Sequence, residues 1–186
     1  MQVDMVHDTQ QAFRTVLDAM ARPGKISRLH DTLDAIVLLA HTLLDREVSY
    51  HMLPGFDEQL QQTVALQTLA QQVDPSNADF LFISAATPPH QIQEALTESK
   101  NGTLIDPHQS ATIIFQTPHI TEGTTWRLTG PGIQTTTELT FHFPPELHQI
   151  RQAKNQEYPL GIDLIITDPT GQIAAIPRTT LMEEVL

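Results

Sequence analysis

The chain has 186 residues, of which 40% are hydrophobic and 17% charged, a balance typical of a folded globular protein rather than a disordered one. Its length fits one domain over residues 1–186. Twenty-two acidic against ten basic residues leave a formal net charge of −12, which argues against nucleic-acid binding and against attachment to anionic membranes. The absence of cysteine excludes disulfides, thiolate nucleophiles and cysteine-held zinc or iron–sulfur clusters in this chain.

The sequence contains no pattern of a targeting or membrane-spanning segment. The first residues lack the basic stretch and following apolar run of a signal peptide. The longest fully apolar run, 35–40, is far shorter than the ~20 residues that span a bilayer. We therefore expect a cytoplasmic protein with no membrane partner.

The first half of the chain is predicted to be mostly helical, because its apolar residues recur at three- and four-residue spacing. Phe13, Val16, Leu17 and Met20 form one apolar stripe on a helix that ends at the breaker 22–24. The next helix has Asp31 or Thr32 as its expected N-cap. The expected elements of this half are helices at 13–20, 33–44 and 57–72 and a short strand at 48–53.

The second half is richer in β-branched and aromatic runs, which favour strands. Strands are expected at 79–83, 112–115, 125–129, 136–143, 162–167 and 172–176, and helices at 91–99 and 144–155. The turn signal at 168–171 predicts a hairpin between the last two strands. Because so many apolar strands need cover on both faces, we predict an α/β fold with a mixed sheet covered by helices.

Known catalytic and metal-binding patterns are missing from the chain. The nine histidines show no H-x-H, H-x₃-H or H-E-x-x-H spacing, so no metal site is predicted. There is no G-x-S-x-G elbow and no G-x-x-x-x-G-K-[ST] loop. No catalytic residue is assigned on this basis.

Two segments are candidate anion or partner contacts. Gly130-Pro131-Gly132 follows an expected strand, and its N–H groups either form an anion-binding nest or belong to a tight turn. Pro177 is expected to end the last strand, so that Arg178, Thr179 and Thr180 present a guanidinium and two hydroxyls at a sheet edge. The alternative for Arg178 is an exposed salt bridge, which contributes at most about 1 kcal/mol.

Four of the ten basic residues fall within fifteen positions: Arg14, Arg22, Lys25 and Arg28. Such a cluster in an acidic chain is either a docking face for an acidic partner or an anion, or a complement to a helix C-terminus.

Four segments resemble one known family in order and spacing. They are Phe13-Arg14-x-x-Leu17-x-Ala19-Met20-x-x-Pro23-Gly24, Leu128-Thr129-Gly130-x-Gly132-Ile133, Tyr158-Pro159-Leu160-Gly161-Ile162-Asp163-Leu164-Ile165 and Ala175-Ile176-Pro177-Arg178-Thr179-Thr180. Together they resemble the PhnH family, the H subunit of the bacterial carbon–phosphorus lyase system for phosphonate use. The loop 106–112 departs from the pattern, because family members often carry an acidic residue near His108 and a glycine near Ser110.

The resemblance implies a fold similar to the pyridoxal-phosphate-dependent transferases that lacks the cofactor site, so no cofactor is expected in this chain. The sequence agrees in part: besides Lys25, its lysines are Lys100 beside a turn and Lys154 at a helix end, and neither of these two is of the apolar-pocket kind whose pKa falls enough for Schiff-base chemistry. It also implies a homodimer that assembles with the G, I and J subunits. That system forms α-D-ribose 1-methylphosphonate 5-triphosphate from ATP and methylphosphonate, and the cysteine-bearing J subunit later cleaves the carbon–phosphorus bond.

Two functional hypotheses remain open. The favoured one is a non-catalytic structural or assembly subunit, because the chain offers no nucleophile–base pair and no metal set. The alternative is a subunit that contacts the triphosphate or phosphonate through Arg178, Thr179, Thr180 and the Gly130–Gly132 turn. A free-standing pyridoxal-phosphate enzyme is a third class, and the lysines argue against it.

Overall fold

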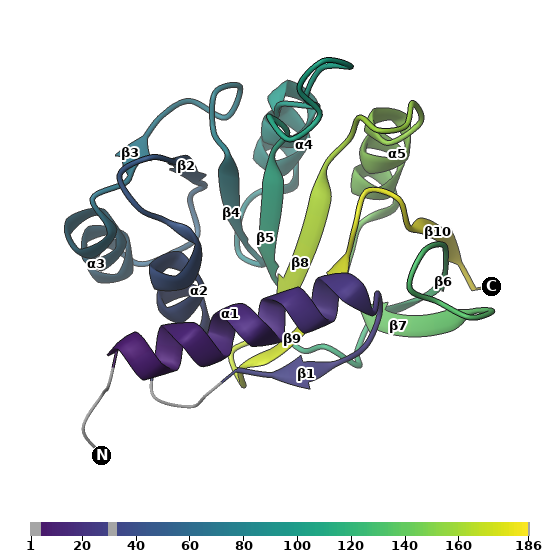
Figure 1. Cartoon of the computed structure of the whole chain (residues 1–186), viewed down its shortest axis with the longest axis horizontal. Coiled ribbons are helices and arrows are strands. Elements are labelled where there is room, and N and C mark those ends of the chain that lie inside the picture. Colours follow the sequence, from purple (N-terminus) through teal and green to yellow (C-terminus); the bar gives the residue numbers. More distant parts are fainter. Residues whose placement is uncertain (1–4, 30–32, 186) are drawn as a thin grey trace.

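The computed structural model describes residues 5–29 and 33–185, which form two sheets and five helices (Figure 1). The helices are α1 (Met5–Ala21), α2 (Ala35–Leu43), α3 (Glu58–Thr68), α4 (Pro89–Glu98) and α5 (Pro145–Lys154). The strands are β1 (Ser27–Arg28), β2 (Ser49–Met52), β3 (Gln71–Gln72), β4 (Phe80–Ser84), β5 (Thr112–Gln116), β6 (Thr124–Thr129), β7 (Thr137–Phe141), β8 (Asp163–Thr167), β9 (Gln172–Ile176) and β10 (Leu181–Glu184).

The larger sheet is mixed and has the strand order β1-β9-β8-β5-β4-β2-β3. In this order, the five strands β3, β2, β4, β5 and β8 are parallel to one another. At the other edge, β9 pairs antiparallel with β8, and β1 pairs antiparallel with β9. The smaller sheet, β10-β6-β7, is antiparallel throughout. The predicted α/β fold with a mixed sheet is therefore confirmed, as is the hairpin of β8 and β9.

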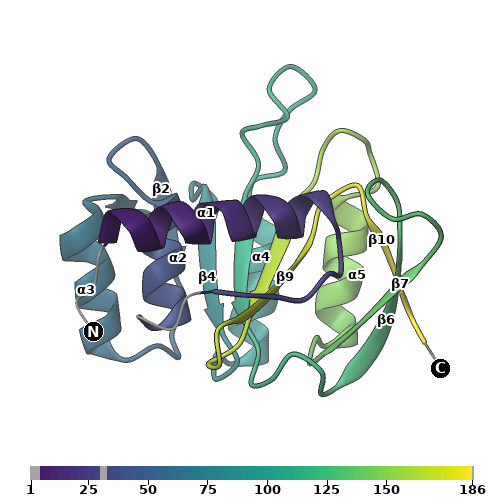
Figure 2. The same ribbon diagram turned by 60° about the horizontal axis from the view of Figure 1, so that its bottom comes forward.

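The helices cover both faces of the larger sheet, and each face has its own apolar core (Figure 2). Successive side chains of a strand point to opposite faces. Phe82 of β4 thus packs on the side of α1, α2 and α3, while its neighbours Leu81 and Ile83 pack on the side of α4 and α5. The core on the side of α4 and α5 also includes the inner face of the smaller sheet, with the fully buried Trp126.

Helix α1 buries only part of the predicted stripe: Val16 is buried and Met20 packs against the core, but Phe13 and Leu17 do not. Ala12, Val16 and Ala19 face the core, whereas Phe13 and Leu17 are 47% and 52% exposed. The small alanine side chains allow the helix to lie close to α2 and β9. The apolar spacing of Phe13 and Leu17 correctly indicated a helix but not which side of it is buried.

Several helix boundaries also differ from prediction, and α1 begins at Met5 rather than at 13. The expected N-caps Asp31 and Thr32 lie outside the described residues, and the cap observed for α2 is Asp34, whose carboxylate accepts from the N–H groups of Ile36 and Val37. Helix α3 ends at Thr68 rather than near 72, because Leu69 adopts a left-handed conformation with φ 59°. The residues that follow pair with β2 as strand β3.

Three short strands were not predicted: β1, β3 and β10. Strands β1 and β3 have only two residues each, and β10 buries only Met182, so none of them shows an apolar alternation. Strand β10 changes the predicted site most, because Pro177 ends β9, which is not the last strand.

Within the described residues, no helix is long and apolar enough to cross a membrane.

Candidate functional site

The segment 177–180 is the corner where the chain passes from the larger sheet to the smaller one. Strand β9 ends at Ile176 and strand β10 begins at Leu181. The N–H of Thr180 donates to the carbonyl of Pro177 at 2.9 Å, which closes the turn. The predicted free sheet edge is therefore an enclosed junction between two sheets, because β10 continues the chain into the smaller sheet.

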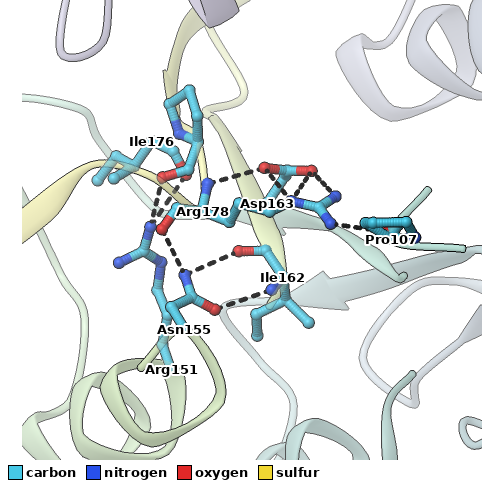
Figure 3. Close-up of polar contacts among 8 residues, drawn as sticks. Pro107, Arg151, Asn155, Ile162, Asp163, Ile176 and Arg178 are labelled. Atoms are coloured by element: carbon cyan, nitrogen blue, oxygen red, sulfur yellow. Dashed lines mark hydrogen bonds and ion pairs between the residues drawn. The ribbon is translucent and has the colours of Figure 1, made fainter. Parts of the chain in front are cut away.

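Arg178 makes an ion pair with Asp163, the first residue of β8 (Figure 3). Its Nε lies 3.2 and 3.1 Å from the two carboxylate oxygens, and its Nη2 contacts the same carboxylate. Its backbone N–H donates to Asp163 at 2.8 Å, and its Nη1 donates to the carbonyl of Pro107 at 2.9 Å. The side chains are only 18% and 12% exposed, so the pair is largely buried rather than an exposed salt bridge.

Arg151 of α5 holds the same corner from the other side. Its side chain is 3% exposed, and its Nη2 donates to the carbonyls of Ile176 at 3.2 Å and Pro177 at 2.8 Å. Both terminal nitrogens lie 3.4 Å from the carbonyl oxygen of Thr180. Burial lowers the pKa of Arg151 to about 10, and the charge of Asp163 acts in the opposite direction. The guanidinium therefore stays charged at neutral pH.

Asn155, the C-cap residue of α5, adds a second set of hydrogen bonds. Its amide donates to the carbonyls of Ile162 at 3.1 Å and Arg178 at 3.3 Å, and its Oδ1 accepts from the N–H of Ile162 at 2.8 Å (Figure 3). Gly161 leaves the room for this contact, since a Cβ there would lie 2.4 Å from Oδ1. Helix α5 thus fixes both the start of β8 and the 177–180 turn.

The structure brings Gly130 to the corner but places Gly132 elsewhere. A Cβ on Gly130 would lie 2.9 Å from the carbonyl oxygen of Thr179 and 3.2 Å from the Cα of Thr180. A Cβ on Gly132 would lie 2.4 Å from the carbonyl oxygen of Ala21, at the end of α1. Both glycines have positive φ, so close backbone approach and turn geometry together account for them.

A cavity of about 540 Å³ lies between α5 and the segment 178–183. Arg151, Arg178 and Thr180 are among the residues that line it. Thr180 is 1% exposed, so its side chain belongs to the wall rather than to the surface. The corner is therefore a packed hydrogen-bonded structure with an adjoining cavity large enough for a small ligand.

The chain as a whole is similar to proteins of bacterial phosphonate metabolism. The family described as "Bacterial phosphonate metabolism protein (PhnH)" matches residues 2–183. The chain belongs to the PhnH family. Its relatives include "Putative C-P lyase subunit protein HtxG" of Stutzerimonas stutzeri, 30% identical over 92% of this chain and 84% of that protein. Another is "Alpha-D-ribose 1-methylphosphonate 5-triphosphate synthase subunit PhnH" of Rhizobium meliloti (strain 1021), 28% identical over 97% of this chain and 92% of that protein.

The lysines of this PhnH-family chain all bond within the protein. Lys25 pairs with Asp18, and Lys100 pairs with Asp79. Lys154 donates to the carbonyl of Ser99 at 2.7 Å, and burial lowers its pKa. In the part of the chain that the structure describes, no three His, Asp or Glu residues gather as a metal site would require. That this chain binds no cofactor and no metal remains a prediction.

The loop in which this chain departs from the family pattern touches the site through its backbone. Arg178 reaches the carbonyl of Pro107, and Asn101 and Ser110 form an isolated bridge at the base of the loop. Ile105, directly before the loop, is 89% exposed. The contact uses a main-chain oxygen and involves neither the His108 nor the Ser110 side chain.

Of the predicted site, Gly130, Arg178, Thr179 and Thr180 come together at the corner, and Gly132 does not. Their contact with substrate or partner stays a prediction. Sequence reasoning missed the residues that bind them: Arg151, Asn155 and Asp163. The sequence held two signals for these residues. Asp163 opens a buried apolar strand, where a carboxylate needs a cationic partner. Arg151 follows Leu147 at helical spacing, which places it on the buried side of the helix.

Proposed function

We propose that this protein is a cytoplasmic, non-catalytic structural or assembly subunit of the complex that forms α-D-ribose 1-methylphosphonate 5-triphosphate from ATP and methylphosphonate. Membership of the PhnH family and the name of the Rhizobium relative support the reaction. The observation that carries the structural role is the corner itself. Arg151, Arg178 and Asn155 donate hydrogen bonds to carbonyls and a carboxylate of the same chain.

We further propose that the chain forms a homodimer and binds the G, I and J subunits, with no nucleic acid and no membrane as partner. Exposed apolar side chains on α1 support an interface there: Val6 is 81%, Phe13 47% and Leu17 52% exposed. The domain 1–186 acts as one unit in this assembly. We also propose that the fold is akin to the pyridoxal-phosphate-dependent transferases without their cofactor. The chain incubated with pyridoxal phosphate is then expected to gain no bound absorbance after gel filtration.

The second candidate is a subunit that contacts the triphosphate or phosphonate directly. It is favoured by the cavity beside the corner, which two arginines line. Of the anion contacts predicted from the sequence, Arg178 and Thr180 line this cavity, whereas Thr179 and the Gly130–Gly132 turn are not among its lining residues.

One experiment separates the two candidates. The G, I and J subunits are purified together with and without this chain, and each preparation, supplemented with the L component, is assayed for product from ATP and methylphosphonate. Loss of both assembly and product without the chain supports the structural role. Full assembly without product supports substrate contact. Normal assembly and normal product without the chain would contradict both.

A further inference from the structure

Buried polar side-chain atoms without a hydrogen-bond partner concentrate at the cavity beside the corner. Seven such atoms occur among the described residues, and four of them lie together: Trp126 Nε1, His148 Nδ1, Arg151 Nε and Thr180 Oγ1. His148, Arg151 and Thr180 line the cavity, and the Trp126 ring lies 4.7 Å from the His148 ring. Native proteins leave few such atoms unpaired, so a cluster of four requires an explanation.

The unpartnered atoms are mainly donors. The indole Nε1 of Trp126 and the Nε of Arg151 only donate, and the hydroxyl of Thr180 can donate. A ligand that satisfies this cluster must therefore be rich in acceptor atoms.

The charge of the cavity favours an anion. Arg151 is buried, and among the described residues no carboxylate lies within ion-pair distance of it. Arg178 lines the same cavity, but its charge is balanced by its ion pair with Asp163, so the attraction comes from Arg151, and Glu183 is the single carboxylate of the lining. A buried cation held only by carbonyls gains Coulomb energy when an anion enters the adjoining space.

We propose that this cavity binds a small phosphate-type oxyanion, attracted by the charge of Arg151 and bonded by the hydroxyl of Thr180. Its volume of about 540 Å³ admits a phosphate, a phosphonate or the phosphate end of a nucleotide. The Thr180 hydroxyl is buried, so binding requires a shift of the side chains that cover it. The cavity is the site of the second candidate above, and the inference rests on that candidate only for which oxyanion is bound.

The single tryptophan of the chain reports on this site, because its ring packs against a residue of the cavity wall. The full chain is titrated at constant ionic strength with inorganic phosphate, methylphosphonate and ATP, and with chloride as control, while its fluorescence is followed. A saturable change in tryptophan fluorescence is expected with at least one of the three oxyanions. The compound that binds most tightly identifies the source of the oxyanion. No change in any arm up to about 10 mM would overturn the inference.

Two variants test the location. Thr180→Val removes a hydroxyl that has no partner in the chain, so the melting temperature should stay equal or rise while affinity falls about tenfold. Gln152→Glu adds a negative charge to the cavity lining and should weaken binding by a similar factor. Gln62→Glu makes the same change on α3, far along the molecule, and should bind as the parent does (Figure 1). Unchanged affinity in both Thr180→Val and Gln152→Glu would place the anion elsewhere.

The outcome is independent of the assembly experiment. If the isolated chain binds oxyanion but does not join the G, I and J subunits, the proposed complex is wrong and the cavity site stands. If the chain assembles normally but binds no oxyanion, only the cavity inference fails.

Discussion

At the scale of single residues, two arginines stabilise the corner by different means. Arg178 pairs with a carboxylate through its planar fork, as lysine cannot. Arg151 instead bonds to three main-chain carbonyls and has a pKa lowered by burial to about 10. Removing either would leave buried groups without partners, which is more damaging than losing a surface charge.

Arg178→Ala is expected to lower the free energy of unfolding by about 2–3 kcal/mol, because it leaves Asp163 largely buried and unpaired. In a domain of this size that is a fall in melting temperature of roughly 4–12 °C. A double-mutant cycle with Asp163→Asn should give a coupling energy above about 1 kcal/mol. A coupling near zero would show that the pair contributes no stability.

Arg178→Lys tests the use of the corner by substrate or partner. If the fork itself is recognised, this variant should impair growth on a phosphonate as sole phosphorus source nearly as much as Arg178→Ala. Melting curves in parallel separate folding from function. Normal growth of a strain complemented with either variant would contradict the functional role.

Asp79 gives the fold a pH dependence. Burial alone would raise the pKa of this carboxyl, but hydrogen bonds from Lys100 and Ser49 and the charge of Lys100 lower it below its ordinary 3.8. The ionised form therefore stabilises the fold above about pH 4, and this stabilisation is lost as the pH falls through the folded-state pKa. In urea unfolding, Asp79→Asn should be less stable than the parent at pH 7, and the difference should shrink near pH 3. A difference that is equal at both pH values would contradict this account.

At the scale of elements, close backbone contacts and hydrogen bonds fix how α1 and α5 pack. Helix α1 finishes against the turn after β6, where the carbonyl of Ala21 meets Gly132. Helix α5 lies beside the corner and binds it through residues one turn apart. The family segments around 13–24 and 128–133, distant in sequence, are thus two sides of one contact.

Gly132→Ala is expected to destabilise the fold by at least about 2 kcal/mol. Its φ of +84° is unfavourable for alanine, and the new Cβ would lie 2.4 Å from a main-chain oxygen that cannot rotate away. Chemical unfolding measures the loss. Pro131→Ala in the same exposed turn is the control and should change stability little. Equal stability of the two variants would show that the α1 contact can relax.

At the scale of the whole molecule, the two faces of the larger sheet carry separate cores, and the smaller sheet closes one of them (Figure 2). The outward side of α1 nevertheless keeps large apolar side chains in solvent. An exposed apolar stripe on the longest helix is typical of a surface that is covered in an assembly.

The isolated chain is expected to sediment as a dimer, at about twice 20.7 kDa at micromolar concentration. Phe13→Glu together with Leu17→Lys should yield a monomer with unchanged unfolding, because neither side chain belongs to the core. Leu66→Glu on α3, also exposed, is the matched control. A parent chain that sediments as a monomer would contradict the dimer, and a dimeric double variant would place the interface elsewhere.

The sequence alone predicted the fold class and most elements. Periodicity and β-branched runs report local preference and burial, and these suffice for five helices and the longer strands. It also indicated the family through four segments, and the match over residues 2–183 confirms it. Strand β2, with four residues, was predicted from its alternation, whereas β10 escaped because only Met182 of its four residues is buried.

The tertiary structure decided what the site residues do. Whether Arg178 is exposed or paired depends on Asp163, fifteen positions away, and on Pro107, seventy-one away. Which side of α1 is buried depends on α2 and β9 rather than on the hydrophobicity of Phe13 and Leu17. Ion pairs, close approaches and cavities form between segments whose separation along the chain is arbitrary, so local patterns can name the participating residues but not their partners.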